Sequence, residues 1–269
     1  MTHPQSGLSS DQRRAFDERG LVHLPGFISR EAADAMAARL WQELARKHGV
    51  RRADPATWSA ERPAQFGPLQ KTGAFNAMAT PGVRAILDEL IGPGAWTEPR
   101  GGWGLPLVCF PTQEAWALPH KIWHLDLTPE PKHPGLLVGR LFLLLAPLRP
   151  RGGGTLVAAG SHRVAERLAA GQNGRMSSQE MRQAMARHHP WFADLMAPPK
   201  PGEDRIGRFM GAETVADGVP LRVEEITGEP GDVWLMHPHA LHGLSANVLD
   251  APRLALTQTI YPKAWTSAY

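Results

Sequence analysis

Short apolar runs separated by glycine and proline fill the chain from Ala95 onward, and this pattern restricts the fold more than any other feature. Apolar runs of about four to eight residues, bounded by such turn residues, are typical of β-strands. We expect strands at 104–110, 121–127, 136–145, 154–158, 221–226, 232–236 and 253–261. The second part of the chain, 95–269, is therefore predicted to be a sheet-based core.

The first part, 1–94, has helical patterns instead. Ser9, Ser29 and Thr80 each precede a stretch with helical apolar spacing and are typical N-caps. We expect helices from these residues to about 19, 47 and 91, and a short strand at 21–24. A further helical stretch, about 163–220, includes a candidate capping box at Ser177 and Glu180. It interrupts the predicted strands, and it is either a decoration or a lid over a site. The whole chain is predicted to be a single domain.

Composition excludes several classes of function. The 269 residues are 42% hydrophobic and 20% charged, and the net charge of +3 comes from 29 basic and 26 acidic residues. The basic residues are scattered, so no nucleic-acid partner is expected. No apolar run is long enough to span a bilayer, no signal peptide is visible, and Cys109 is the single cysteine. We expect a cytoplasmic protein without a membrane partner.

The stretch 122–127 places a histidine and a carboxylate among apolar residues. Side chains of a strand alternate between faces, so His124 and Asp126 would point the same way. Two histidines and one carboxylate form the facial triad that holds non-haem Fe(II) with open positions. A His-x-Asp pattern is frequent by chance, and a strand-end histidine beside a solvated Asp is the alternative. A third ligand elsewhere in the chain would decide between them.

Three histidines near the C-terminus offer that ligand: His237, His239 and His242. Arg253 follows His242 by eleven residues and opens an apolar strand. The guanidinium fork matches the two oxygens of a carboxylate, so Arg253 beside a metal would be a suitable carboxylate clamp. The alternative for Arg253 is a surface ion pair after a turn.

Several motifs occur together along nearly the whole chain. They are Phe16, Gly20 and Leu24-Pro25-Gly26; Trp123-His124-Leu125-Asp126; Gly152-Gly153-Gly154-Thr155-Leu156-Val157 with Gly160-Ser161-His162-Arg163; and Gly231-Asp232, Leu241-His242-Gly243, Asn247 and Pro252-Arg253. In order and spacing they resemble the phytanoyl-CoA dioxygenase-like family of Fe(II)- and 2-oxoglutarate-dependent oxygenases. The resemblance implies an α+β, mainly β fold, with a jelly-roll core (double-stranded β-helix, cupin-like) and N-terminal helices packed on it.

The resemblance also assigns residues. It selects His242 as the third metal ligand, because the family carries this histidine before a glycine and eleven residues ahead of an arginine. His237 and His239 are then turn residues or line the pocket, and Arg253 binds the far carboxylate of 2-oxoglutarate. The family often carries a basic residue on an upstream strand that reaches the cosubstrate. Lys71 stands at about the right distance, and an ordinary solvated lysine is the alternative.

The implied cofactors are Fe(II), 2-oxoglutarate and O2, with ascorbate as a supporting reductant. The implied reaction hydroxylates a small organic molecule and releases succinate and CO2. Related halogenases lack the carboxylate ligand, so Asp126 argues against halogenation. An acyl-CoA substrate would need basic residues near the pocket. The candidates are Arg140, Arg149, Arg151 and Arg163, and the alternative is that these arginines are simply solvated.

Three other classes of protein remain open from the residues alone. A cupin-like metal enzyme without a cosubstrate, such as an isomerase or hydrolase, needs the two histidines and the aspartate but not Arg253. A zinc hydrolase accepts the same ligands, because tetrahedral zinc also binds His and carboxylate with one open position. A non-catalytic barrel that binds a small ligand is the third class.

Overall fold

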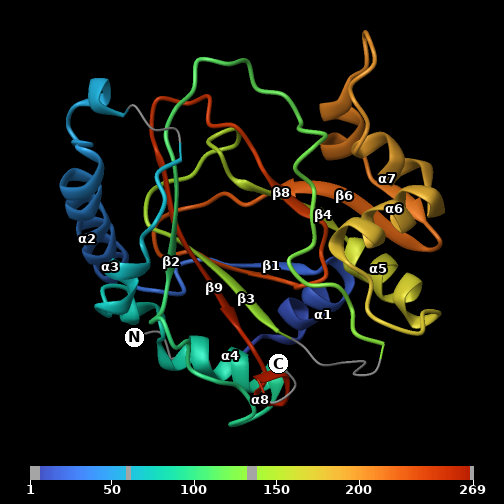
Figure 1. Ribbon diagram of the computed structural model, residues 1–269, viewed down its shortest axis with the longest axis horizontal. Coiled ribbons are helices and arrows are strands. Elements are labelled where there is room, and N and C mark those ends of the chain that lie inside the picture. Colours follow the sequence, from blue (N-terminus) through green and yellow to red (C-terminus); the bar gives the residue numbers. More distant parts are fainter. Residues whose placement is uncertain (1–6, 59–61, 132–137, 267–269) are drawn as a thin grey trace.

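The computed structural model describes residues 7–58, 62–131 and 138–266. Its N-terminal part contains helices α1 (Ser10–Arg19), α2 (Arg30–His48), α3 (Gly67–Lys71) and α4 (Pro81–Ile91), short 3-10 turns at Pro55–Thr57 and Asn76–Met78, and strand β1 (Leu21–Leu24). Figure 1 shows α2 and α3 on the left of the molecule, α4 at the bottom, and the helices of the 163–220 segment on the right. Among the described residues, no helix is long and apolar enough to cross a membrane.

The second part is built from two antiparallel sheets. The larger contains β1, β2 (Leu105–Cys109), β3 (Gly139–Leu144), β7 (Val233–Met236) and β9 (Arg253–Ile260), in the order β1-β7-β3-β9-β2. The smaller contains β4 (Thr155–Ala159), β5 (Thr214–Ala216), β6 (Val219–Glu225) and β8 (His242–Leu244), in the order β5-β6-β4-β8. The N-terminal part thus supplies the edge strand β1 to the larger sheet.

Alternation along the strands produces three apolar clusters. Leu141 and Leu143 of β3 face the N-terminal helices, whereas Phe142 and Leu144 face the interior between the two sheets. Side chains of β9 and β4 alternate in the same way, and those that face inward belong to the same interior cluster. A polar residue on the Phe142 face of β3 or on the matching face of β9 therefore points into the space between the sheets.

The third cluster covers the outer face of the smaller sheet. Helices α5 (Ser161–Ala170), α6 (Ser178–His188) and α7 (Pro190–Leu195), with a π-helical turn at Gly207–Gly211, form most of the predicted insertion. Met181 and Phe192 from these helices pack with Leu156 of β4. The same segment also contacts residues 123–125 through Ser178 and Arg182 and lines the neighbouring cavity through Arg175. The chain ends with a short helix α8 (Lys263–Thr266).

Most of the predicted local structure is confirmed. Ser9 and Ser177 form complete capping boxes, and Ser29 and Thr80 cap α2 and α4. The strand predicted at 121–127 is wrong, because only His124 pairs there, in an isolated bridge with His242. No other described residue of this segment pairs with β8, which forms its ladder with β4 instead. Positions 136 and 137 of another predicted strand lie outside the described residues.

Candidate metal centre

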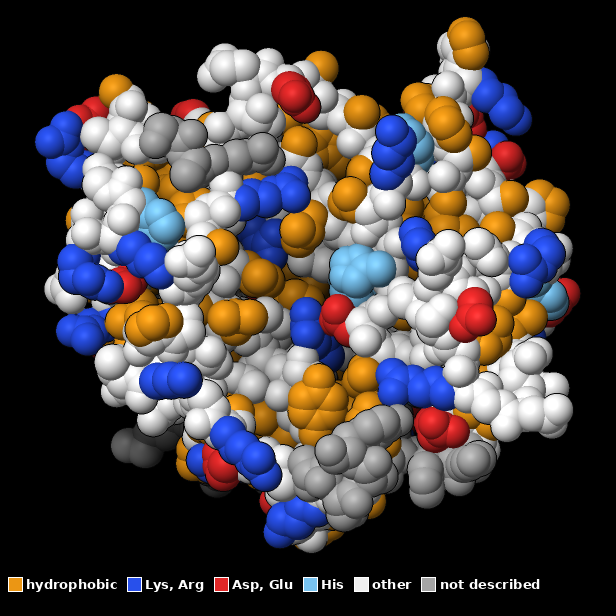
Figure 2. All heavy atoms as spheres, in the orientation of Figure 1, with side chains coloured by type: hydrophobic (Ala, Val, Ile, Leu, Met, Phe, Trp, Pro, Cys, Tyr) orange, Lys and Arg blue, Asp and Glu red, His pale blue; other side chains and the backbone are white. Residues whose placement is uncertain are grey.

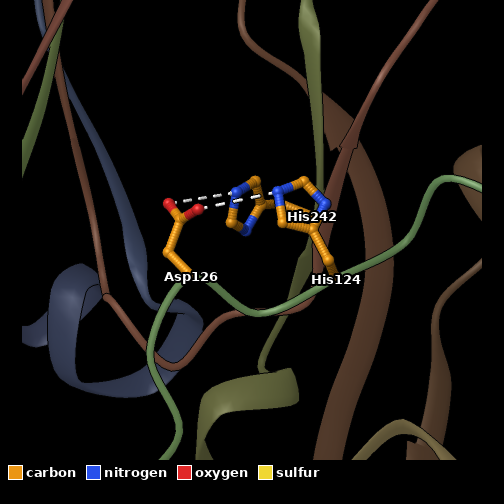
Figure 3. Close-up of side chains that lie close together, drawn as sticks. All are labelled: His124, Asp126 and His242. Carbon is orange, nitrogen blue, oxygen red and sulfur yellow. Dashed lines mark ion pairs between the residues drawn. The ribbon is translucent and has the colours of Figure 1, made fainter. Parts of the chain in front are cut away.

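Three side chains meet at one point between the sheets, as Figure 3 shows. His124 Nε2 lies 3.6 Å from Asp126 Oδ1, and His242 Nε2 lies 3.4 Å from Asp126 Oδ2. The two imidazole centroids are 4.3 Å apart. Two imidazole nitrogens and a carboxylate oxygen therefore converge at the spacing expected for neighbouring ligands of one metal ion.

Main-chain pairing brings the two histidines together. The amide of His124 donates to the carbonyl of His242, and the amide of His242 donates to the carbonyl of His124, each at 2.9 Å. His242 begins β8, which pairs with β4 through Val157. Asp126 follows two residues after His124 and points the same way, as the alternation argument predicted. The direction was right although the segment is not a strand.

Backbone carbonyls set the tautomer of both histidines. His124 Nδ1 lies 3.0 Å from the carbonyl oxygen of Ile122, and His242 Nδ1 lies 2.9 Å from that of Ala240. A carbonyl oxygen only accepts, so each Nδ1 carries the hydrogen and each neutral ring has its lone pair on Nε2. Both lone pairs are thus directed at the shared point, as metal ligation requires.

Charge at the site is arranged around Asp126. Burial alone would raise the pKa of Asp126, but the adjacent imidazoles of His124 and His242, which attract the carboxylate when they are protonated, and the charge of Arg140 outweigh it and hold the pKa well below the ordinary value. The hydrogen bond with Asp126 raises the pKa of His124, against the opposing effect of burial. Asp126 is therefore ionised at neutral pH and is ready to bind a cation.

A second histidine cluster lies after β7, outside this centre. His239 Nδ1 is 3.1 Å from Glu166 Oε1, and His237 Nε2 is 3.5 Å from the same oxygen. The amide of His239 donates to His237 Nδ1 at 3.3 Å, so the proton of His237 resides on Nε2 and points at Glu166. The cluster is a hydrogen-bonded network around one carboxylate, and its His237 tautomer is the wrong one for ligation through Nε2.

Arg253 is buried rather than placed in a surface ion pair. Its Nη1 donates to the carbonyl of Gly153 at 2.6 Å, its Nη2 is 3.4 Å from Thr155 Oγ1, and its Nε has no partner among the described residues. Burial lowers the pKa of Arg253 to about 10, which leaves it charged at neutral pH. A buried cation with an unused donor can accept a carboxylate ligand.

The position of Arg253 relative to the metal ligands is set by β4. Thr155, which Arg253 contacts, lies two residues from Val157, and Val157 pairs with His242. Two strand residues span about 7 Å. A short dicarboxylate is thus long enough to bridge the two positions.

Lys71 is not part of this arrangement. It lies at the end of the short helix α3 rather than on a strand, and its side chain is exposed. The other candidate basic residues do not gather either, because Arg149 pairs with Glu229 at the surface and Arg151 lies over the ring of Trp116.

Arg140 is the residue that sequence reasoning missed as part of the metal centre. Its Nη2 lies 3.0 Å from Asp126 Oδ2, and its Nη1 donates to Thr259 Oγ1 at 2.6 Å. The alternation of side chains along the strand could have identified Arg140, because it places this residue on the same inward face as Phe142 and Leu144. A charged residue on an inward face needs a partner there.

A hollow opens beside the centre. Figure 2 shows the molecule hollowed near the middle of this face, with histidine, acidic and basic side chains on the walls. A cavity of about 780 Å³ is lined in part by Leu127, which follows Asp126, and by Thr259, which contacts Arg140. Tyr261 and Trp265 lie on its rim with their rings stacked at 6.1 Å. The volume is in the range of cavities that bind drug-sized molecules.

The residues present fit Fe(II) and 2-oxoglutarate. Two neutral imidazoles and one carboxylate match the ligands of non-haem Fe(II), and as three ligands they leave positions open. The unused Nε of buried Arg253 matches a cosubstrate carboxylate. Zinc also accepts these three ligands, but it gives no reason for a buried arginine nearby.

No family model and no curated protein matches the chain. Among solved structures it is similar to SnoK, a non-haem α-ketoglutarate-dependent carbocyclase from nogalamycin biosynthesis, with 18% identity, a TM-score of 0.59, and coverage of 98% of this chain and 87% of that one. HygX from Streptomyces hygroscopicus, with nickel and 2-oxoglutarate bound, has 15% identity, a TM-score of 0.56 and coverage of 96% and 88%.

A third structure is EctD from S. alaskensis with 2-oxoglutarate and 5-hydroxyectoine, with 16% identity, a TM-score of 0.54 and coverage of 98% and 79%. At identities of 18% or less these likenesses show the fold alone. The chain therefore has the mixed helix and antiparallel-sheet fold of 2-oxoglutarate-dependent non-haem iron enzymes.

Proposed function

We propose that this protein is an Fe(II)- and 2-oxoglutarate-dependent dioxygenase that hydroxylates a small organic molecule. The observation that carries the proposal is the convergence of three ligand atoms near a buried arginine: His124 and His242 direct their lone pairs at Asp126, and Arg253 contacts Thr155, two residues along β4 from the position that pairs with His242. A metal site alone would not require Arg253. A site for a metal and a dicarboxylate requires both the three metal ligands and the arginine.

The strand order supports a jelly-roll core of the phytanoyl-CoA dioxygenase-like type, in a single domain over residues 1–269. Two antiparallel sheets face each other and enclose a cluster drawn from both. The segment at His124 adds to the smaller sheet next to β8. His124 and His242 thus lie on the smaller sheet, and Arg253 extends from the larger sheet to β4 of the smaller one.

Each proposed site residue has a separate task. His124, Asp126 and His242 hold Fe(II), with the carbonyls of Ile122 and Ala240 fixing the two rings. Arg253 binds the far carboxylate of 2-oxoglutarate and orients the cosubstrate toward the metal. When bound, Fe(II) supplies the coupled oxidation of 2-oxoglutarate and substrate C–H by O2, which yields succinate, CO2 and the hydroxylated product. Lys71 remains a candidate cosubstrate contact, although it is exposed.

Asp126 bears on the type of reaction. A halogenase needs an open position for halide where this carboxylate binds, so Asp126 favours hydroxylation over halogenation. The cavity of about 780 Å³ suits a small organic substrate rather than a macromolecule. Of the four arginines considered for an acyl-CoA, Arg140 is committed to Asp126, and Arg149 is committed to Glu229.

The test is succinate formation by the purified chain with Fe(II), 2-oxoglutarate, O2 and ascorbate. We expect slow succinate release without substrate and stimulation by the correct one in a screen of small molecules. A zinc hydrolase or a cosubstrate-free isomerase would not consume 2-oxoglutarate, and a non-catalytic barrel would neither consume it nor need metal. Failure of the metal-loaded protein to bind 2-oxoglutarate at all would refute the proposal.

A further inference from the structure

Arg140 of β3 lies between the metal ligands and the cavity, and its guanidinium is held on both sides. Nη2 is 3.0 Å from Asp126 Oδ2, and Nη1 donates to Thr259 Oγ1 at 2.6 Å. The guanidinium carbon lies 5.4 Å from the centroid of the Phe142 ring. The side chain is only 19% exposed. A planar group with two anchored nitrogens and a ring beneath it has a fixed orientation.

This contact makes the two oxygens of Asp126 unequal. Each oxygen faces one histidine, Oδ1 facing His124 Nε2 at 3.6 Å and Oδ2 facing His242 Nε2 at 3.4 Å, but only Oδ2 is also bonded to Arg140, at 3.0 Å. A carboxylate can bind a cation through one oxygen or through both. Because the guanidinium occupies one side of Oδ2, Oδ1 is the oxygen that is freer to bind a metal.

The number of bound oxygens matters for the rest of the site. Two histidines and a carboxylate bound through one oxygen leave three of six octahedral positions open. A carboxylate bound through both oxygens leaves two. A chelating cosubstrate takes two adjacent positions, so a second Asp126 oxygen on the metal would compete directly with it or with O2.

We propose that Arg140 is a positioning residue that restricts Asp126 to a single metal–oxygen bond. The inference rests on the proposed function, since only a site that must accept a chelating cosubstrate needs the restriction. Thr259 holds the guanidinium from the opposite side and also lines the cavity. Asp126 is thereby connected through Arg140 to the wall of the cavity.

The experiment uses the full chain loaded with Co(II), whose visible spectrum responds to coordination number. The variants are Arg140→Met, Arg140→Lys and Thr259→Val. Arg149→Met is the matched control, because Arg149 is 61% exposed and pairs with Glu229. Each protein is titrated with Co(II) alone and then, when loaded, with 2-oxoglutarate, and its melting temperature is measured.

We expect Arg140→Met to bind Co(II) at least as tightly as wild type, because it gains an oxygen ligand and loses a neighbouring cation. Its spectrum without 2-oxoglutarate should change, and its 2-oxoglutarate affinity should fall by about tenfold or more. Arg140→Lys, which keeps the charge and a donor, should restore part of both, and Thr259→Val should show a smaller effect of the same sign. The control should match wild type.

Three outcomes would overturn the inference. An unchanged Co(II) spectrum with weakened 2-oxoglutarate binding would mean that Arg140 contacts the cosubstrate itself. A parallel loss of Co(II) affinity and melting temperature would mean a purely structural role. Identical behaviour of Arg140→Met and wild type would mean that Arg140 does nothing to Asp126. If Arg140→Met fails to fold, Arg140→Lys and Thr259→Val carry the same comparison. Wild-type protein that binds Co(II) but no 2-oxoglutarate would refute the proposed function, and the spectral comparison would still test Arg140.

Discussion

His124 and His242 are joined by two main-chain hydrogen bonds of 2.9 Å, each amide donating to the other residue's carbonyl. The pair is the only contact of ladder type that the 121–127 segment makes with the smaller sheet. It fixes the two backbones, and the carbonyls of Ile122 and Ala240 then fix the two rings. Backbone geometry thus preorganises the candidate metal centre.

The first prediction separates the two histidine clusters. His242→Ala should lower Ni(II) or Co(II) affinity by about 100-fold or more, since a ligand contributes at least as much as the residues that support it. His239→Ala should leave the affinity essentially unchanged, because its Nδ1 hydrogen bonds to Glu166 rather than to the centre. Isothermal titration with each metal measures both. Equal losses in the two variants would contradict the assignment.

Local rules predicted most of the helices because their signals are local. A capping box joins residues three apart, so Ser9 with Gln12 and Ser177 with Glu180 can be recognised without the fold. The short strand β5 was missed because three residues carry no periodicity that could be distinguished from a loop.

The site was only partly predictable for a related reason. The proposed ligands His124, Asp126 and His242 could be named from motif spacing, but Arg140 could not be joined to them. Its contact with Asp126 depends on the register that sets Arg140 opposite Thr259, across a long separation in sequence. Likewise, His237 differs from the proposed ligands in its tautomer, because its Nδ1 accepts a hydrogen bond from a backbone amide. That is a three-dimensional property.

The second prediction concerns Asp232, which joins β7 to the N-terminal part. Its carboxylate accepts from the amides of Gly26 at 2.8 Å and Glu229 at 2.9 Å, and it lies 2.8 Å from His23 Nε2. Burial would raise the pKa of Asp232, but these hydrogen bonds outweigh it and lower the pKa. Asp232→Asn should therefore reduce the free energy of unfolding at pH 7 by about 2 kcal/mol.

The pH dependence of that difference follows from its sign. A carboxyl whose pKa is lower in the folded state stabilises the protein fully above its unfolded pKa, about 3.9, and loses this effect as pH falls toward the folded pKa. The stability gap between wild type and Asp232→Asn should be constant above about pH 5 and should shrink at lower pH. Urea denaturation across this range measures it, and a gap that widens in acid would contradict the account.

The third prediction uses two glycines at opposite ends of α5. Gly160 has a φ of 84°, and a Cβ there would overlap the carbonyl oxygen of Pro220. Gly160→Ala should therefore cost about 3 kcal/mol of stability, from left-handed strain and overpacking together. Gly171 has a φ of −90° and open space around it. Gly171→Ala should leave the free energy of unfolding unchanged in the same denaturation assay. A loss of stability comparable to that of Gly160→Ala would mean that any substitution at an end of this helix is destabilising, whether or not the added Cβ meets another atom.

The last prediction concerns Arg253 and distinguishes cosubstrate binding from metal binding. Arg253→Met removes a buried charge-assisted donor, which corresponds to about 3 kcal/mol, or roughly 100-fold in 2-oxoglutarate affinity. Arg253→Lys keeps the charge but loses the planar fork, so its affinity should lie between those of Arg253→Met and wild type. Co(II) affinity should change little in either variant, because Arg253 contacts Gly153 and Thr155 rather than a metal ligand.

Titration of 2-oxoglutarate into the Co(II)-loaded variants measures the effect, with Arg222→Met as the control. Arg222 lies on β6 with its side chain 41% exposed and paired with Glu224, so its loss should alter neither affinity. A 2-oxoglutarate affinity that is unchanged in Arg253→Met would remove Arg253 from the site. Loss of Co(II) and 2-oxoglutarate binding together would instead mean that Arg253 supports the fold around the metal, since the Gly153 carbonyl that it satisfies would be left buried and unpaired.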